Sequence, residues 1–155
     1  MSRVMRDSGE HESAKQAAAE KVVRQMLSKD GFSRWLGIEV LDIQPHHVTC
    51  RMTVREDMLN GFGVCHGGAT FALADSAFAF ASNTHGQVAM SIDNSISYPA
   101  PARGGDVLTA VAQMESSTGR LAFYRVEVHN QEATLVATFR GTVYKTKHSH
   151  FAPGA

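Results

Sequence analysis

A single carboxylate inside an apolar segment is the residue of this sequence best placed to do chemistry. Asp75 is the only charged residue between Ala69 and Ser82. Its close neighbours in the chain are apolar: Leu73, Ala74, Ala77 and Phe78. A carboxylate among apolar side chains costs free energy unless it is hydrogen-bonded or faces a pocket, and such surroundings tune its proton affinity. Asp75 is therefore a candidate general base or nucleophile. The plainer alternative is that it caps a loop or pairs with an arginine.

Two glycines follow a histidine at the start of the same segment, as His66-Gly67-Gly68. Glycines let a ligand approach the backbone closely, and the free amides of a first helical turn favour a developing oxyanion. A thioester carbonyl that becomes tetrahedral would suit this position. The alternative is that Gly67 and Gly68 only make a tight turn into the helix.

The spacing of these two features predicts a shared site. Gly67 and Asp75 are eight residues apart, or roughly 12 Å along one helix. A reacting carbonyl carbon should lie about 3 Å from both its nucleophile and its oxyanion donors. If both groups serve one reaction, Gly67 of one subunit must meet Asp75 of another. A twofold homodimer with two equivalent sites is the arrangement that achieves this.

Two helices are expected around this chemistry. Residues 66–86 are apolar nearly all round, which predicts a buried central helix that ends near Gly86. Residues 13–30 are rich in strong helix formers with an apolar stripe, and Ser13 with Gln16 matches a capping box. An amphipathic helix is therefore expected to begin at Ser13.

The remaining segments read as strands. Residues 38–43 look extended, and residues 47–54 alternate between two faces. Four further segments rich in Val, Thr, Phe and Tyr are separated by turns: 88–98, 107–115, 121–130 and 134–145. The order predicts an α+β fold in which an antiparallel sheet of five to six strands, the last four forming a meander, wraps around the central helix. One domain over residues 13–146 is expected, between a flexible N-terminus (1–12) and a flexible tail (147–155).

Composition narrows the class of protein. The chain has 155 residues, 15 Lys and Arg against 15 Asp and Glu, and only two cysteines, Cys50 and Cys65. No overall field would recruit nucleic acid or an anionic membrane, and neither partner is expected. The sparse cysteines suit a reducing compartment, and no apolar run is long enough to span a membrane, so the cytoplasm is expected.

No cofactor or metal is expected either. Two histidine clusters could be considered as metal ligands: His46-His47 and His148-Ser149-His150. Neither has Cys, Asp or Glu at a spacing typical of metal ligands. A surface loop and a tail are the plainer interpretation of both.

Two motifs together resemble the hotdog-fold thioesterases of the phenylacetate-degradation family. They are NGFGVCHGG, from Asn60 to Gly68, and LADSAF, from Leu73 to Phe78, and the similarity extends over about residues 32–146. The resemblance implies a hotdog fold and hydrolysis of acyl-CoA thioesters, often phenylacetyl-CoA or its hydroxylated forms. It also implies homotetramers made of two dimers.

The resemblance further implies roles for individual residues. Asp75 matches the catalytic carboxylate, and Gly67 matches the amide that polarises the thioester carbonyl. Asn60 matches a side chain that places water or the carboxylate, and His66 matches a position near the thioester. Ser91 matches a serine that some relatives use to orient water. Two simpler interpretations stay open, since Asn60 could be a turn residue and His66 a helix cap.

The phosphates of CoA need cations near the mouth of the site. Arg103 and Arg120 are the leading candidates, with Lys145 and Lys147 behind them. Gly68 is expected to lie against the substrate beside Gly67. Exposed basic residues are often only solubilising, which is the alternative for each of them.

Two rival functions and the acyl group stay open. A hotdog dehydratase would need a histidine and a carboxylate to converge, but this chain has Asp75 rather than Glu and no Phe-Pro after its loop histidine. A non-catalytic acyl-CoA binding module is the other rival. Five side chains could line a pocket for an aromatic acyl group or simply belong to the core: Phe62, Phe71, Phe78, Phe80 and Met90.

Overall fold

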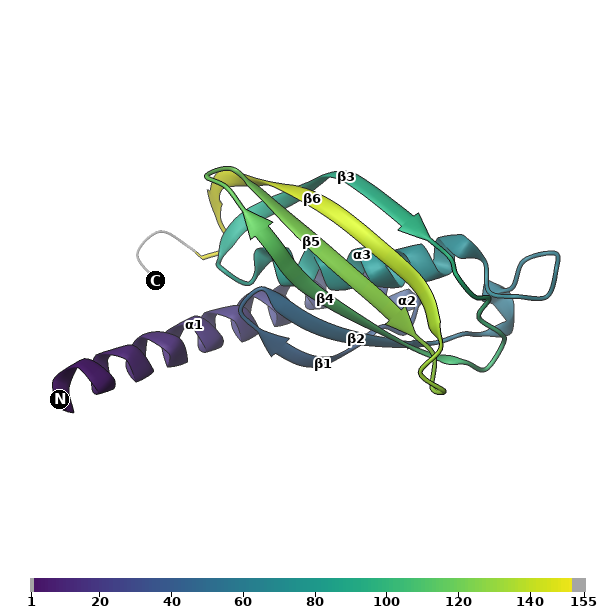
Figure 1. Cartoon of the computed structure of the whole chain (residues 1–155), viewed down its shortest axis with the longest axis horizontal. Coiled ribbons are helices and arrows are strands. Elements are labelled where there is room, and N and C mark those ends of the chain that lie inside the picture. The colour runs from purple at the N-terminus through teal and green to yellow at the C-terminus, as the bar shows by residue number, and fades with distance from the viewer. Residues whose placement is uncertain (1, 152–155) are drawn as a thin grey trace.

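A curved sheet wrapped around one helix dominates the computed structural model, which describes residues 2–151, with side chains from residue 9 onward (Figure 1). The helix is α3 (Gly67–Asn83), and the sheet has six antiparallel strands. The strands are β1 (Glu39–Gln44), β2 (His47–Thr53), β3 (Gln87–Ser97), β4 (Val107–Ser117), β5 (Leu121–His129) and β6 (Leu135–Ser149). The predicted α+β architecture is confirmed.

Burial of α3 follows from its composition. Ten of its 17 residues are buried, which removes its apolar side chains from water. The Phe78 ring lies at the centre of this core, with its centroid 5.7 Å from Tyr124 and 5.4 Å from Phe139. The sheet thus encloses the helix that carries both Gly67 and Asp75.

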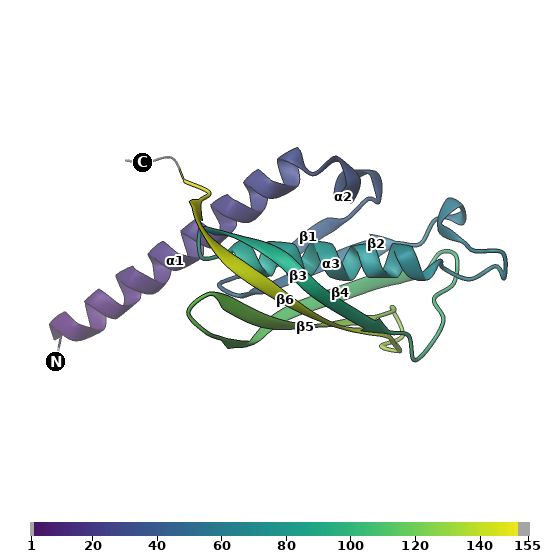
Figure 2. The ribbon, with the colours of Figure 1, turned by 90° about the horizontal axis from the view of Figure 1, so that it is seen from above.

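The order of the strands differs from the predicted meander. The sheet runs β1-β2-β4-β5-β6-β3, so only β4, β5 and β6 form a meander. The strand β3 pairs with β6 at one edge, because the chain crosses the concave face of the sheet as α3 and emerges on the side opposite β2 (Figure 2). The prediction that β3 pairs with β4 was therefore wrong, and β3 has a free edge.

The N-terminal helix is longer than predicted. Helix α1 spans Ser2–Lys29 and projects beyond the sheet (Figure 1). Ser13 lies inside it, so the predicted capping box is wrong, and the Gln16 side chain instead donates to Ile43 O over 2.6 Å. Residues 2–12, expected to be flexible, are the first turns of α1. The inner face of the helix is fully buried through Ala19, Val22 and Val23.

Two short helices and the chain end complete the fold: α2 (Gly31–Trp35), η1 (Glu56–Met58) and the end of β6. The strand β6 continues to Ser149, so residues 147–149 belong to the sheet rather than to a tail. His150 Nε2 then lies 2.7 Å from Asn83 Oδ1. Residues 152–155 of the expected tail, like Met1, lie outside the described residues.

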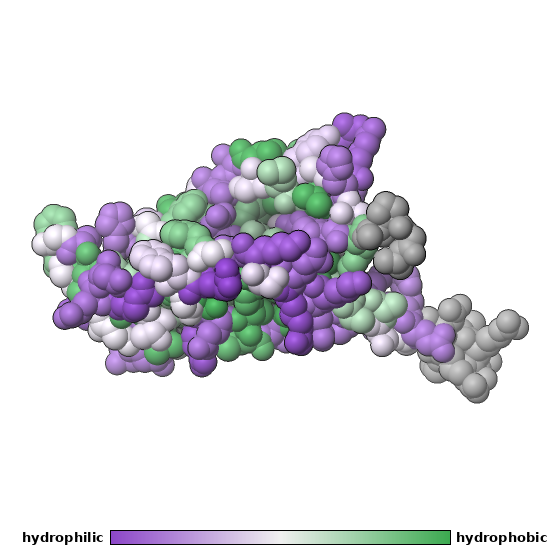
Figure 3. Space-filling view, turned by 180° about the vertical axis from the view of Figure 1, so that it is seen from behind, coloured by the Kyte–Doolittle hydropathy of each residue, from purple (hydrophilic) through white to green (hydrophobic). Residues whose placement is uncertain are grey.

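The surface is mixed in polarity. Figure 3 shows the face opposite the sheet view of Figure 1, where apolar areas alternate with hydrophilic ones. Several large apolar side chains are exposed, among them Phe62, Met90 and Ile92. Within residues 2–151, no helix combines the length and apolar character needed to cross a bilayer.

Candidate active site

Asp75 is half-buried on α3 and holds no counter-charge. Its Oδ1 accepts a hydrogen bond from Asn94 Nδ2 over 3.3 Å. Burial raises the pKa of Asp75, and the negative charge of Asp30 raises this pKa further. No arginine or lysine forms an ion pair with it among the described residues, so the structure does not support the arginine-paired alternative. A carboxylate of raised pKa is well suited to accept a proton.

A short hydrogen-bonded chain leads from the surface to this carboxylate. Asn94 lies on β3, where its Oδ1 accepts from Ser91 Oγ over 2.9 Å while its Nδ2 donates to Asp75. Ser91 is exposed, so the chain ends at solvent. The structure therefore brings Ser91 and Asp75 together through Asn94. Sequence reasoning missed Asn94, because its role depends on the placement of β3 beside α3.

Gly141 makes room for this arrangement. It lies on β6, directly opposite Asn94. A Cβ at this position would lie 2.9 Å from Asn94 Oδ1 and 2.6 Å from Phe78 Cζ, distances too short for side-chain contact. Only glycine fits between the core ring and the carboxamide that contacts Asp75.

A second carboxylate stands near Asp75. Asp30 is the N-cap of α2, where its side chain accepts from Ser33 N over 2.9 Å and from Ser33 Oγ over 2.5 Å. Ser33 Oγ is in turn 2.8 Å from Ser76 Oγ, and both serines are buried. This chain fixes α2 against α3 beside the candidate base. Asp30 looked like an ordinary helix end in the sequence, and its closeness to Asp75 could not be seen there.

The His66-Gly67 turn presents one free amide. His66 is the N-cap of α3, and its Nδ1 accepts from Gly68 N over 2.9 Å. Since Nδ1 is an acceptor, a neutral ring carries its proton on Nε2. Ala69 N donates to His66 O. Gly67 N–H is then the amide of this turn that has no acceptor in the described part of the chain. The helix-cap interpretation of His66 is borne out, and it occupies the Gly68 amide.

Tyr98 lies directly against Gly67. The Tyr98 hydroxyl donates to Gly67 O over 2.8 Å. A Cβ on Gly67 would lie 3.1 Å from both Cζ and Oη of Tyr98. A pocket of about 370 Å³ opens beside this contact, lined mainly by small and apolar residues that include Val64, Ala100 and Val136. Tyr98 was another residue that sequence reasoning missed.

Asn60 organises the loop that leads to this turn. Its Oδ1 accepts from Phe62 N over 2.9 Å and from Val64 N over 3.4 Å. The Asn60 side-chain oxygen therefore stabilises the turn, as the simpler interpretation expected. Its amide nitrogen donates no hydrogen bond to any described residue, which leaves two donor hydrogens for a ligand or water.

The two arginines expected to hold CoA lie far apart. Arg103 is exposed in the loop between β3 and β4, next to the pocket at Gly67. Arg120 lies in the turn at the other end of β4 and donates to Tyr144 Oη over 3.0 Å. The 11 residues of β4 separate the two ends by roughly 35 Å. One protomer cannot use both arginines at one site.

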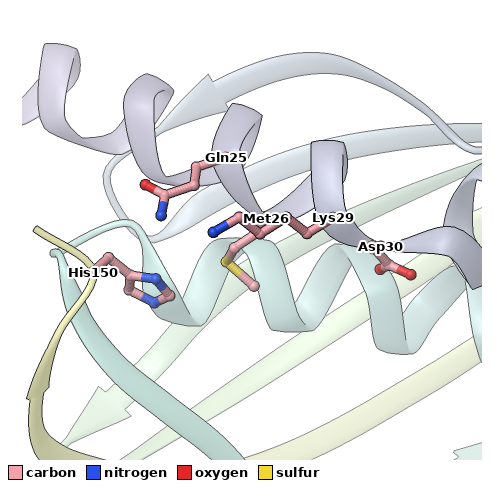
Figure 4. A pocket seen from close by; sticks show the side chains of 5 residues that line it. All are labelled: Gln25, Met26, Lys29, Asp30 and His150. Carbon is pink, nitrogen blue, oxygen red and sulfur yellow. The ribbon is translucent and has the colours of Figure 1, made fainter.

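A groove lies along the C-terminal half of α1. It has a volume of about 350 Å³ and lies between α1 and the chain end (Figure 4). Its lining residues are Gln25, Met26, Lys29, Asp30 and His150. Asp30, whose negative charge contributes to the raised pKa of Asp75, is one of these lining residues. Nothing in the sequence pattern indicated this groove.

The five side chains proposed for an acyl pocket do not gather within one protomer. Phe78 and Phe80 are buried in the core, and Phe71 packs edge-on against Phe139 with centroids 5.5 Å apart. Phe62 is 93% exposed and Met90 is 61% exposed. The core interpretation holds for Phe78 and Phe80, while Phe62 and Met90 are left available for other contacts.

Comparison with known proteins places this chain in a family. The sequence profile of the Thioesterase superfamily matches residues 62–137. Acyl-coenzyme A thioesterase PaaI of Escherichia coli (strain K12) is 38% identical over 120 residues, which cover 77% of this chain and 86% of that protein. The chain belongs to the thioesterase superfamily.

Further relatives of the superfamily agree in fold and activity. The structure of the E. coli PaaI protein from the phenylacetic acid degradation operon superposes with a TM-score of 0.85 at 34% identity, covering 86% of this chain and 97% of that one. Human acyl-coenzyme A thioesterase 13 is 32% identical over 79% of this chain and 90% of its own. The fold is the hotdog fold and the enzyme is an acyl-CoA thioesterase, as the resemblance predicted.

Proposed function

We propose that the enzyme hydrolyses arylacetyl-CoA thioesters, such as phenylacetyl-CoA, at sites that two protomers share. The observation that carries the shared site is the separation of the Gly67 amide from the Asp75 carboxylate on one helix. Both lie on α3, eight residues apart, or roughly 12 Å along the helix axis. One carbonyl can contact both groups only if Gly67 of one protomer approaches Asp75 of the partner subunit.

The free edge of β3 supports this pairing. β3 ends the sheet, carries Ser91 and Asn94, and exposes 61% of Met90 and 59% of Ile92. An exposed edge strand with apolar side chains favours pairing with another chain. Twofold pairing through β3 would make the sheet continuous and lay the two α3 helices side by side in opposite directions. Two such dimers would form the homotetramer that we propose.

The reaction follows from the groups that this dimer brings together. The Gly67 N–H and the Nε2–H of His66 stabilise the oxyanion that forms when water attacks the thioester carbonyl carbon. Asp75 of the partner subunit takes the proton of that water. The C–S bond then breaks, the proton passes from Asp75 to the sulfur, and free acid and CoA are released. Asn94 holds the carboxylate, and Asn60 offers two donor hydrogens to the water.

Separate features support the proposed arylacetyl-CoA substrate and the cytoplasmic location. One similar protein is named for a phenylacetic acid degradation operon, and exposed Phe62, in the loop before Gly67, offers an aromatic contact. Arg103, at the same end as Gly67, suits a CoA phosphate. Two free, buried cysteines, Cys50 and Cys65, fit a cytoplasmic enzyme.

Steady-state hydrolysis with a thiol-trapping dye tests the substrate class. Phenylacetyl-CoA, hydroxyphenylacetyl-CoA, benzoyl-CoA and medium-chain acyl-CoAs would be compared by kcat/KM. The arylacetyl esters should give the highest values. A preference for medium chains over every aryl ester would refute the proposed substrate.

Mixing of two inactive variants tests the shared site. Asp75→Ala and Gly67→Leu proteins, unfolded and refolded together, form heterodimers in which one site carries both changes and the other carries none. These heterodimers should regain up to half of the wild-type activity per dimer. Heterodimers verified by mass spectrometry that stay inactive would overturn the shared site without affecting the thioesterase assignment.

A further inference from the structure

A separate pocket lies at the opposite end of α3 from Gly67. It has a volume of about 250 Å³ and is lined by Lys15 and Ala18 of α1, Pro45 and His46 of the β1–β2 turn, and Thr84 and His85 after α3. His85 is ten residues beyond Asp75 in the chain, or roughly 15 Å along the helix direction. The hydrolytic mechanism makes no use of this pocket.

The backbone at His46 is held in an unfavourable conformation. Pro45 and His46 form the two-residue turn of a hairpin, since Gln44 pairs with His47, and His46 has φ of 60°. Glycine is the residue that this position of a turn after proline favours. A bulky side chain in such a conformation persists only when its surroundings compensate, and such positions concentrate at functional sites. The positive φ of His46 therefore indicates that its side chain has a role in this pocket.

Hydrogen bonds hold both the imidazole and the backbone of His46. Its Nδ1 lies 3.0 Å from Tyr124 Oη, and its backbone N–H donates to Thr84 Oγ1 over 2.8 Å. Burial raises the pKa of Tyr124, so the phenol keeps its one proton. Of its two acceptors, Nδ1 at 3.0 Å is nearer than Ala81 O at 3.5 Å, and we assign the donation to Nδ1. A neutral His46 then carries its own proton on Nε2. The His85 ring stacks on His46 with centroids 5.7 Å apart.

Basic groups surround the pocket, and no carboxylate lines it. Burial lowers the pKa of His46, and the charges of Lys145 and Lys15 lower it further. Burial also lowers the pKa of His85, to about 4, with contributions from His46, Lys145 and His150. The positive charges that oppose protonation of both rings have no acidic group to balance them in the lining. An anion in the pocket would supply that balance.

We propose that this pocket binds a tetrahedral oxyanion, such as a phosphate group, as an effector or anchoring site separate from thioester hydrolysis. The donors are the Lys15 ammonium, the His46 Nε2–H and the His85 ring, which match the acceptor-only oxygens of such an ion. A metal ion does not fit, because no cluster of three metal-ligating side chains forms among residues 2–151 and the lysines repel cations. The carbonyl end of α3 opposes an anion, but Ala81 O already accepts from Thr84 Oγ1.

Linkage fixes the pH dependence. A bound anion favours protonated histidine, so it raises the pKa of His46 and His85, and its affinity rises as the pH falls. Sulfate is a suitable probe because its own charge is constant between pH 5 and pH 7. Inorganic phosphate and adenosine 3',5'-bisphosphate, the nucleotide portion of CoA with its phosphates, distinguish a free phosphate from the phosphate of a CoA ester.

The test is an NMR titration of the full-length protein, with the imidazole C–H signals of His46 and His85 as the readout. At constant ionic strength, sulfate should shift both signals to saturation at pH 5 and bind several-fold more weakly at pH 7, because the free pKa of His85 is about 4. Lys15→Ala should weaken binding at least tenfold, and Lys29→Ala, in the groove of Figure 4, should not. His46→Asn should also weaken it, since asparagine tolerates positive φ without the imidazole.

Two outcomes would overturn the anion site. One is a linear, unsaturable shift that is equal in wild type and Lys15→Ala, which would show a general salt effect. The other is saturable binding that does not change with pH or with either pocket variant. Tighter binding of the bisphosphate than of inorganic phosphate would identify a CoA nucleotide as the source, and equal binding would identify free phosphate. Hydrolysis in sulfate-free buffer should be unchanged in Lys15→Ala, so this site can fail independently of the thioesterase.

Discussion

Asn94 Nδ2 donates a hydrogen bond to Asp75 Oδ1 over 3.3 Å, while Asn94 Oδ1 accepts from Ser91 Oγ over 2.9 Å. A donor to a carboxylate favours its charged form. Asn94 thus opposes the effects of burial and of Asp30, which both raise the pKa of Asp75. Burial, the largest cause, and the charge of Asp30 therefore act on the Asp75 carboxylate in one direction, and the hydrogen bond from Asn94 acts in the other.

Replacement of Asn94 by alanine removes the hydrogen bond that stabilises the charged form of Asp75. We expect kcat/KM to fall about fivefold, because one hydrogen bond of this kind contributes about 1 kcal/mol. The acidic limb of the pH profile of kcat/KM should move to higher pH, since the carboxylate loses a donor. Ser116→Ala, an exposed change on β4 away from the proposed dimer edge, is the control. A lower rate with an unmoved acidic limb would mean that Asn94 acts in another way.

Replacement of Asp30 by asparagine tests the group that raises the pKa of Asp75. The negative charge of Asp30 raises the pKa of Asp75, so its removal should lower that pKa and move the acidic limb to lower pH. Asparagine can still cap α2 through its side-chain oxygen, which keeps Ser33 and the helix in place. The measurement is again kcat/KM against pH. Ser33→Ala, which disturbs the cap without removing a charge, should leave the limb where it is.

Asp75→Asn should separate stability from activity. A carboxyl whose folded-state pKa is raised destabilises the fold increasingly as the pH rises from its unfolded to its folded pKa, and fully above both. Asparagine removes this penalty, so the variant should be more stable at pH 7; the difference should shrink as the pH falls through the raised folded-state pKa and vanish below the unfolded value of 3.8. Hydrolysis should fall at least about a hundredfold.

Urea denaturation at equal protein concentration measures this difference, because assembly also contributes to stability. A variant less stable than wild type at pH 7 would show that the Asp75 carboxylate contributes net stability in the assembled protein. That result would contradict the functional interpretation of its burial.

Gly141→Ala should damage both the core and the site. The added methyl would lie 2.6 Å from Phe78 Cζ and 2.9 Å from Asn94 Oδ1. Overpacking of this kind costs about 1–3 kcal/mol in the free energy of unfolding. The displaced Asn94 should also reproduce part of the Asn94→Ala rate loss. Gly119→Ala, where nothing lies within 4 Å of the added methyl, is the matched control and should leave unfolding and kcat/KM unchanged.

The sequence pattern was sufficient for the parts of this fold that depend on local chemistry. The all-round apolar character of α3 predicted its burial, and the strands were found within a few residues of their bounds, apart from the longer β6. The unusual position of Asp75 was visible because a charge in an apolar helix is a local contrast. The start of α1 was missed because Ser13 resembles a cap although the helix continues before it.

The parts that could not be predicted depend on long-range pairing. The place of β3 beside β6 is set by how the chain crosses the sheet, and no residue of β3 encodes it locally. Asn94 reaches Asp75 only because of that crossing, and Asp30 reaches it only through the packing of α2 on α3. The residues that tune the candidate base were therefore hidden, while the base itself was not.

Gly141 also has a consequence for how the chain folds. It stands between Asn94 of β3 and Tyr124 of β5 in the paired strands, with the Phe78 ring against its Cα. A slip of β6 by one residue would bring Arg140 or Thr142 to this place, where no side chain fits. A shifted register is thus disfavoured at the same point where Asp75, the candidate base, obtains its hydrogen bond. Correct alignment of β6 and the placement of Asn94 beside Asp75 both depend on the absence of a side chain at Gly141.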